Sequence, residues 1–144
     1  MKAKRIVSFL MAFVCLFSSF IFAAYAADSN GDVIKASGLI YQYDLSASKR
    51  DSTTLIVYGL TDCDPVVVKC GFKNLKVQRR ANSSSSWSDF YDYGNVYLDS
   101  HHYAIGRYLN VDPGYQYRIT CKHYAKKNIL NTQTISNTSN IVTF

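Results

Sequence analysis

Short runs of β-branched and aromatic residues dominate this chain and strongly restrict the fold classes open to it. Beyond residue 36, Val, Ile, Tyr and Thr cluster in runs of strand length, and no window of helical length repeats apolar residues at three-and-four spacing. Stretches rich in Ser, Asn, Asp, Pro and Gly separate the runs. The predicted strands are Leu39–Leu45, Thr53–Leu60, Phe72–Arg80, Ser86–Tyr91, Asn95–Ser100, Ala104–Val111, Tyr115–Tyr124 and Ser139–Phe144. Seven or eight short strands predict an all-β fold, an antiparallel β-sandwich.

The first 26 residues have the pattern of a secretory signal peptide. A basic start (Lys2, Lys4 and Arg5) precedes an almost unbroken apolar run, residues 6–22, and the small-x-small sequence at residues 24–26. A retained anchor helix is the competing interpretation, because the apolar run approaches the roughly 20 residues that span a bilayer. The polar stretch that follows favours cleavage after Ala26, a secreted protein and no membrane span after cleavage.

Removal of this segment changes the composition from which function is inferred. The remaining 118 residues contain 13 basic and 10 acidic residues and three of the four cysteines. This length predicts one domain, residues 37–144, after a flexible lead at 27–36. A net charge of only +3 argues against dedicated nucleic-acid binding.

One turn has a specific structural signature. Val111, Pro113, Gly114 and Tyr117 combine an apolar residue, a Pro-Gly turn and a tyrosine that enters the next strand. The segment resembles the E–F corner of fibronectin type III domains, in which the tyrosine ring packs into the core and its hydroxyl bonds back to the turn. No cysteine follows two residues after Tyr117, as one would in immunoglobulin domains.

The chain from Cys63 onward also resembles an uncharacterised family of small secreted proteins from Gram-positive bacteria. The segments that carry this resemblance are residues 63–67, 78–80, 86–87, 114–118 and 120–127. It implies a bacterial exported protein and implies no activity.

Three cysteines remain after export, and a disulfide can persist outside the cytoplasm. Strand alternation places Tyr117, Ile119, Cys121 and His123 on the inward face of one strand. We expect a Cys63–Cys121 disulfide, with Cys70–Cys121 as the main rival and three reduced thiols as a further alternative, because sequence does not separate the pairings.

The sequence provides little for catalysis. It contains no glutamate, and its aspartates lie mostly in loops. Cys121 and His123 share one strand face and could form a zinc site with His101 or His102, or a thiol–imidazole pair. A packed or exposed histidine beside a structural cysteine is the simpler interpretation, so we expect no metal, no cofactor and no enzymatic activity.

Two surfaces are candidate binding sites. The outward residues of two neighbouring strands include the cations Lys76, Arg80, Arg118 and Lys122, and such a surface suits an anionic polymer. Alternatively, the acidic and tyrosine-rich segment 89–93 folds over these cations and pairs with them. Trp87, Tyr91 and Tyr93, with Tyr97 nearby, form the second surface, an aromatic stretch suited to sugars or proteins. Tyrosine is also a common strand residue on half-buried faces, which is the structural alternative.

The sequence therefore predicts an exported, non-catalytic β-sandwich that interacts with an anionic cell-envelope polymer or another protein. The alternative is a small secreted effector, or a thiol- or metal-dependent enzyme that uses Cys121 and His123.

Overall fold

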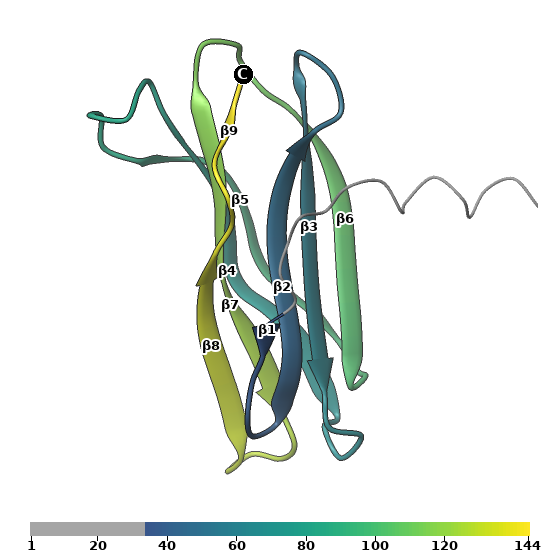
Figure 1. Cartoon of the computed structure of the whole chain (residues 1–144). Coiled ribbons are helices and arrows are strands. Elements are labelled where there is room, and N and C mark those ends of the chain that lie inside the picture. The colour runs from purple at the N-terminus through teal and green to yellow at the C-terminus, as the bar shows by residue number, and fades with distance from the viewer. Residues whose placement is uncertain (1–33) are drawn as a thin grey trace, which may run out of the picture.

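The protein is an antiparallel β-sandwich in the computed structural model, which describes residues 34–144 (Figure 1). The predicted signal peptide and most of the predicted lead lie outside these residues. None of the described residues forms a helix long and apolar enough to cross a membrane. The strands are β1 Ile34–Lys35, β2 Ile40–Lys49, β3 Thr54–Cys63, β4 Lys69–Arg80, β5 Ser88–Leu98, β6 His102–Asn110, β7 Gln116–Lys126, β8 Thr132–Thr138 and β9 Val142–Thr143.

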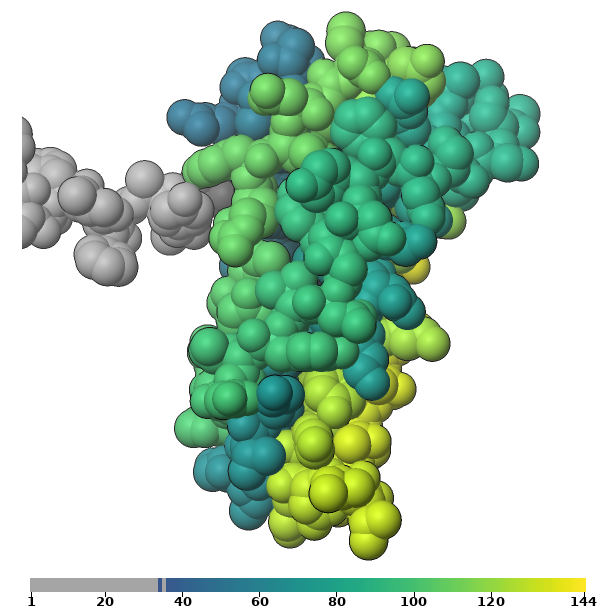
Figure 2. All heavy atoms as spheres, turned by 180° about the vertical axis from the view of Figure 1, so that it is seen from behind, coloured from purple at the N-terminus to yellow at the C-terminus, as the bar shows by residue number. Residues whose placement is uncertain are grey.

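The strands form two sheets that pack face to face. One has the order β1-β2-β3-β6, and the other has the order β5-β4-β7-β8, with β9 also paired to β7. The register of β4 with β7 runs from Lys69 opposite Lys126 to Arg80 opposite Gln116, which sets the two ends of the second sheet. Residues 81–87 project sideways from the sandwich between β4 and β5 (Figures 1 and 2).

Period-two burial explains why these segments are strands. In β3, residues 55, 57, 59, 61 and 63 are buried, and the residues between them are only partly buried. In β7, Tyr117, Ile119, Cys121 and His123 are buried on the face toward the first sheet. The large core cluster includes Leu55, Phe72 and Ile119, and a smaller cluster of Ile40, Cys63, Val67, Cys70 and Ala125 fills the end near residues 64–68.

Two predicted strand boundaries are wrong for identifiable reasons. The segments 86–91 and 95–100 form one strand, β5, because the Asp92-Tyr93-Gly94 sequence makes a bulge rather than a turn. Gly94 adopts φ +68°, donates its N–H to Asp92 Oδ1 at 2.7 Å and stays paired with Leu75. The predicted strand 139–144 is reduced to β9, and the preceding β8 was missed.

Polar side chains account for the missed strand β8. Its only large apolar residue is Ile135, so it lacks the alternating apolar pattern of an amphipathic strand. Gln133 instead points inward, accepts a bond from the Ile40 N–H at 2.9 Å and donates to the Ser37 carbonyl at 3.0 Å. These bonds tie β8 to the opposite sheet where an apolar contact would otherwise be needed.

Tyr117 joins the turn between β6 and β7 to the core. Its ring is fully buried, and its hydroxyl accepts the Asp112 N–H and donates to the Asp112 carbonyl, both at 3.0 Å. Val111 is buried, whereas Pro113 and Gly114 are exposed, with Gly114 at φ +85°. One side chain therefore satisfies two backbone groups of the turn.

We expect Tyr117→Phe to lower the free energy of unfolding by about 1–2 kcal/mol, because two hydrogen bonds are lost while the packed ring remains. Urea unfolding followed by fluorescence measures the change. Tyr91→Phe is the matched control, since Tyr91 is 46% exposed, and a change below about 0.5 kcal/mol is expected there. Equal effects in the two variants would contradict the assigned role of the hydroxyl.

Candidate functional site

The outer face of β4 and β7 brings the sequence-predicted cations onto adjacent strands. Gln78 lies opposite Arg118, Lys76 opposite Thr120 and Lys73 opposite Lys122. These side chains point away from the core because Leu75, Val77, Ile119 and Cys121, which alternate with them, are buried. The two strands thus present one continuous polar surface.

Acidic residues of β5 neutralise part of this surface. Asp89 accepts from Lys76 Nζ at 2.6 Å and from Gln78 Nε2 at 2.9 Å, and Asp92 lies 3.6 Å from Lys76 Nζ. The bond to Asp89 raises the pKa of Lys76, and the same ammonium lowers the pKa of Asp89. Lys76 is therefore ion-paired, as the alternative expected. Segment 89–93 does not fold over the cations, however: it lies beside β4 as part of β5 and, within residues 34–144, its aspartates pair with none of the other three predicted cations.

Two of the other three predicted cations, Arg80 and Arg118, lie against one indole ring. The guanidinium carbons of Arg80 and Arg118 lie 4.4 and 4.3 Å from the centre of the Trp87 ring. Each such contact contributes about 0.5–2 kcal/mol, depending on how far the cation is removed from water. We call Arg80, Trp87 and Arg118 the Arg–Trp–Arg cluster; it joins the cationic surface to the start of the aromatic stretch.

Amides and a backbone carbonyl, rather than carboxylates, orient the two guanidinium groups. Arg80 donates from Nε to Gln116 Oε1 at 2.8 Å and from Nη1 to the Ser83 carbonyl at 3.2 Å. Arg118 donates from Nε to Gln78 Oε1 at 3.0 Å. Within residues 34–144, neither arginine has a carboxylate within 4.0 Å. Burial, and then the neighbouring charge of Arg80, lower the pKa of Arg118.

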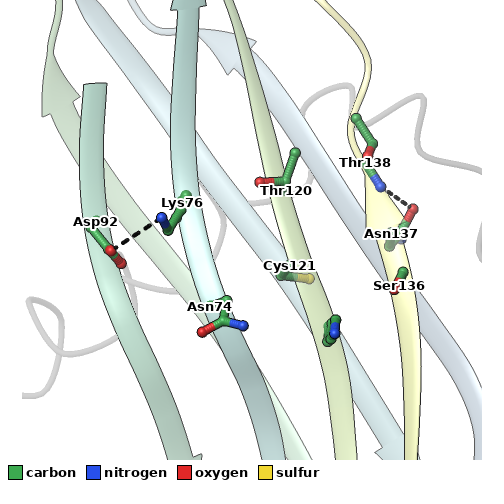
Figure 3. A pocket seen from close by; sticks show the side chains of 9 residues that line it. Asn74, Lys76, Asp92, Thr120, Cys121, Ser136, Asn137 and Thr138 are labelled. Carbon is green, nitrogen blue, oxygen red and sulfur yellow. Dashed lines mark hydrogen bonds and ion pairs between the residues drawn. The ribbon is translucent and has the colours of Figure 1, made fainter. Parts of the chain in front are cut away.

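A polar depression continues the surface from Arg118 along β7. Hydroxyl and amide side chains from three strands line it together with two lysines (Figure 3); the lining residues are Asn74, Lys76, Asp92, Thr120, Cys121, Lys122, Ser136, Asn137 and Thr138. Thr120 is two residues from Arg118, about 7 Å along the same strand face. Lys122 is exposed at the far side and has no carboxylate partner within the described chain. The surface therefore pairs two charged guanidinium groups with a row of neutral hydrogen-bonding groups.

The aromatic stretch does not form one platform. The ring centres of Tyr91 and Tyr93 lie 4.6 Å apart, but Tyr93 packs against the large core cluster. Burial is the main cause of the raised pKa of Tyr93. Tyr97 covers Tyr124, with ring centres 5.1 Å apart, and Lys73 Nζ lies 4.1 Å from the centre of the Tyr124 ring. Tyr124, which alternation places on the outer face, is therefore buried there.

The expected Cys63–Cys121 disulfide is not formed. All three cysteines of the described residues are free and buried. Cys70 lies opposite Ala125, so Cys121 is four residues, or about 13 Å, farther along β7. Cys121 belongs to the large core cluster, whereas Cys63 and Cys70 share the smaller one. Alternation correctly predicts the face of β7 on which Cys121 lies, but it does not give the position of Cys121 along that strand relative to Cys63.

His123 and Cys121 are arranged as core residues. Thr61 Oγ1 lies 2.8 Å from His123 Nδ1, and Asn137 Nδ2 lies 3.2 Å from Nε2, so both ring nitrogens are occupied. Burial lowers the pKa of His123 to about 4 and raises the pKa of Cys121 to about 12. Near neutral pH the pair is thus a neutral imidazole and a protonated thiol, without the thiolate that nucleophilic chemistry requires.

The other histidines lie apart from this pair. His102 Nδ1 lies 3.2 Å from Asp62 Oδ1, and both His101 and His102 are exposed, whereas His123 is buried. Residues 34–144 contain no group of three or more His, Cys, Asp or Glu side chains arranged to hold a metal ion. The structure does not bring together the zinc ligands considered from the sequence.

Sequence reasoning missed the side chains that complete the Arg–Trp–Arg cluster. Gln78 and Gln116 lie on neighbouring strands and each orients one arginine, which follows only from the strand register. It also missed residues 127–131, the β7–β8 loop, where Ile129 and Leu130 are 87% and 97% exposed. That loop lies at the opposite end of β7 from the cluster.

No protein-family model matches this chain, and searches of curated proteins and of solved structures found no significant similarity.

Proposed function

We propose that the protein is an exported, non-catalytic interaction module whose outer β4–β7 face binds an anionic cell-envelope polymer. The observation that carries this proposal is the Arg–Trp–Arg cluster, in which two guanidinium groups share one ring and have no carboxylate partner within residues 34–144. The charge of Arg80 lowers the pKa of Arg118, so the two like charges repel each other, and an anion bound beside them would relieve that repulsion. Guanidinium groups bind phosphate well because their N–H donors match its oxygens.

The neutral part of the surface favours a particular type of anion. Thr120, Ser136 and Thr138 line the depression that continues from Arg118 toward Lys122. Their hydroxyl groups can hydrogen-bond a polyol or a sugar, while the arginines pair with phosphate. A polymer that alternates phosphate and polyol, such as teichoic acid, presents both groups in a repeating chain. Export rests on the signal-peptide pattern of residues 1–26 and on the resemblance to small secreted proteins of Gram-positive bacteria.

The double variant Arg80→Gln with Arg118→Gln tests the proposal. We expect it to weaken binding of synthetic poly(glycerol phosphate) by at least about tenfold, because one charge-assisted hydrogen bond contributes about 1.5–3 kcal/mol. Calorimetry at several salt concentrations measures both the affinity and the salt dependence, which should decrease with the lost cations.

Arg107→Gln with Lys127→Gln is the matched control. Both residues are exposed and lie outside the outer β4–β7 face, and the net charge changes equally. Equal weakening in the two double variants would mean that general charge rather than the cluster binds the polymer. Unchanged binding in the Arg80/Arg118 variant would also contradict the proposal. Thermal unfolding of both variants establishes that they are folded.

A further inference from the structure

Cys63 and Cys70 lie together where the chain crosses from one sheet to the other. Cys63 is the last residue of β3, Cys70 is the second residue of β4, and residues 64–68 connect the strands. Both side chains are 0% exposed and belong to the small cluster with Ile40, Val67 and Ala125. The two cysteines therefore belong to one buried cluster, one on each sheet of the sandwich.

The Cys70 side chain approaches the strand that carries Cys63. Cys70 Sγ lies 4.0 Å from the carbonyl oxygen of Thr61, which is two residues before Cys63 on the same strand. The neighbouring Cys63 thiol lowers the pKa of Cys70, and the neighbouring Cys70 thiol, together with burial, raises the pKa of Cys63. The lower pKa makes Cys70 the better nucleophile of the pair.

We propose that Cys63 and Cys70 form a disulfide that links the two sheets when the protein meets a disulfide oxidant. The thiolate of Cys70 attacks one sulfur of the oxidant, for example glutathione disulfide, and releases one thiolate. Cys63 then loses its proton and attacks the Cys70 sulfur of the mixed disulfide, which releases the second thiolate. The protein loses two protons and two electrons, and the oxidant gains the two electrons as two thiols.

This pairing assigns Cys121 as the single thiol that remains. It lies in the other core cluster, and burial raises its pKa to about 12, so it is a poor competitor for the oxidant. The bond would close an eight-residue loop. In the chain-entropy approximation, such a loop raises the folding equilibrium constant on the order of 50-fold.

Peptide mapping tests the assignment. Residues 27–144, the chain expected after signal-peptide cleavage and the part that holds these three cysteines, are unfolded in urea, refolded in a mixture of reduced and oxidised glutathione, alkylated and digested with trypsin. Lys69 lies between the two cysteines, so cleavage there separates residues 51–69 from residues 70–73. We expect these peptides to remain joined until a reductant is added, with Cys121 alkylated. Because unfolding in urea exposes every thiol before refolding begins, burial does not limit access of the oxidant to any of them.

Three variants serve as controls, and the stability of the wild type is a second readout. Cys121→Ser should keep the linked peptides, and either Cys63→Ser or Cys70→Ser should abolish them. The oxidised wild type should melt roughly 10 °C above the reduced protein. A linked peptide that contains Cys121, a glutathione adduct without an internal bond, or three alkylated cysteines would each overturn the proposal.

Discussion

Gly71→Ala is expected to lower the free energy of unfolding by about 3–5 kcal/mol. Gly71 adopts φ +150°, a conformation that residues with a side chain rarely adopt, and a Cβ atom there would clash with the Val96 carbonyl oxygen. It would also lie 2.9 Å from the Tyr97 Cα atom. All the obstructing atoms belong to the β5 backbone, so no side chain can rotate away. Backbone strain and overpacking each cost about 1–3 kcal/mol.

Relief of this clash would move β4 away from β5. Gly71 pairs with both Tyr97 and Tyr124, and its carbonyl accepts a hydrogen bond from Thr61 Oγ1 at 3.2 Å. Urea denaturation measures the loss of stability. Gly106→Ala is the control, because nothing lies within 4 Å of a Cβ atom built there, and a change within about 0.5 kcal/mol is expected. Similar values for the two variants would contradict the close approach of β4 and β5.

Acidification from pH 6.5 to pH 4 should remove about 3 kcal/mol of stability through His123. In the folded protein, burial lowers its pKa from 6.5 to about 4, and each unit corresponds to about 1.4 kcal/mol. Over this interval the unfolded chain binds a proton that the folded chain does not, so acid favours unfolding. This contribution is complete above pH 6.5 and is lost as the pH falls toward 4.

Burial is the cause of the lowered pKa of His123, and no charged group of residues 34–144 contributes to it. Its neighbours are Thr61, Asn137, and the rings of Tyr43 and Phe72 at 4.9 and 5.3 Å. Asp44 acts in the opposite direction, because burial raises its pKa and protonation then favours the folded state. The contribution of His123 is therefore obtained by comparison with His123→Gln rather than from the wild type alone.

The wild type should lose more stability than His123→Gln between pH 6.5 and pH 4. Denaturant unfolding at each pH measures both proteins. Nuclear magnetic resonance of the imidazole in the folded wild type is an independent measurement, since His123 should titrate only near pH 4. Parallel pH profiles for the two proteins, or titration of His123 near pH 6.5, would count against a buried neutral imidazole.

Alternation along the strands was enough to predict the fold class and the inward faces. Leu75, Val77, Tyr117, Ile119 and His123 are all buried, as the period of two requires. The pattern was not sufficient where polar groups replace apolar contacts, as in β8, or where a turn sequence becomes a bulge, as in β5. Local sequence does not report how a segment pairs with a distant strand.

In the candidate site, too, the features set by local sequence could be predicted, whereas those set by contacts between distant segments could not. The outward direction of Arg80 and Arg118 follows from alternation, and their placement on neighbouring strands follows from sandwich topology. The contact of both arginines with Trp87 does not follow from alternation or topology, because residues 81–87 leave the sheet and return to it. The predicted Cys63–Cys121 disulfide was wrong for a similar reason. Alternation gives the face of the strand on which Cys121 lies, but not its position along the strand relative to Cys63.

The bulges of β5 affect how the protein behaves at high concentration. β5 is an outer strand of its sheet, and its pairing with β4 leaves one extra β5 residue between Asp92 and Gly94 and another between Asp89 and Tyr91. A strand from another molecule would need a straight row of free N–H and C=O groups to extend the sheet. The interrupted edge, which also carries Asp89 and Asp92, does not provide that row, so edge-to-edge aggregation is disfavoured on this side of the sandwich.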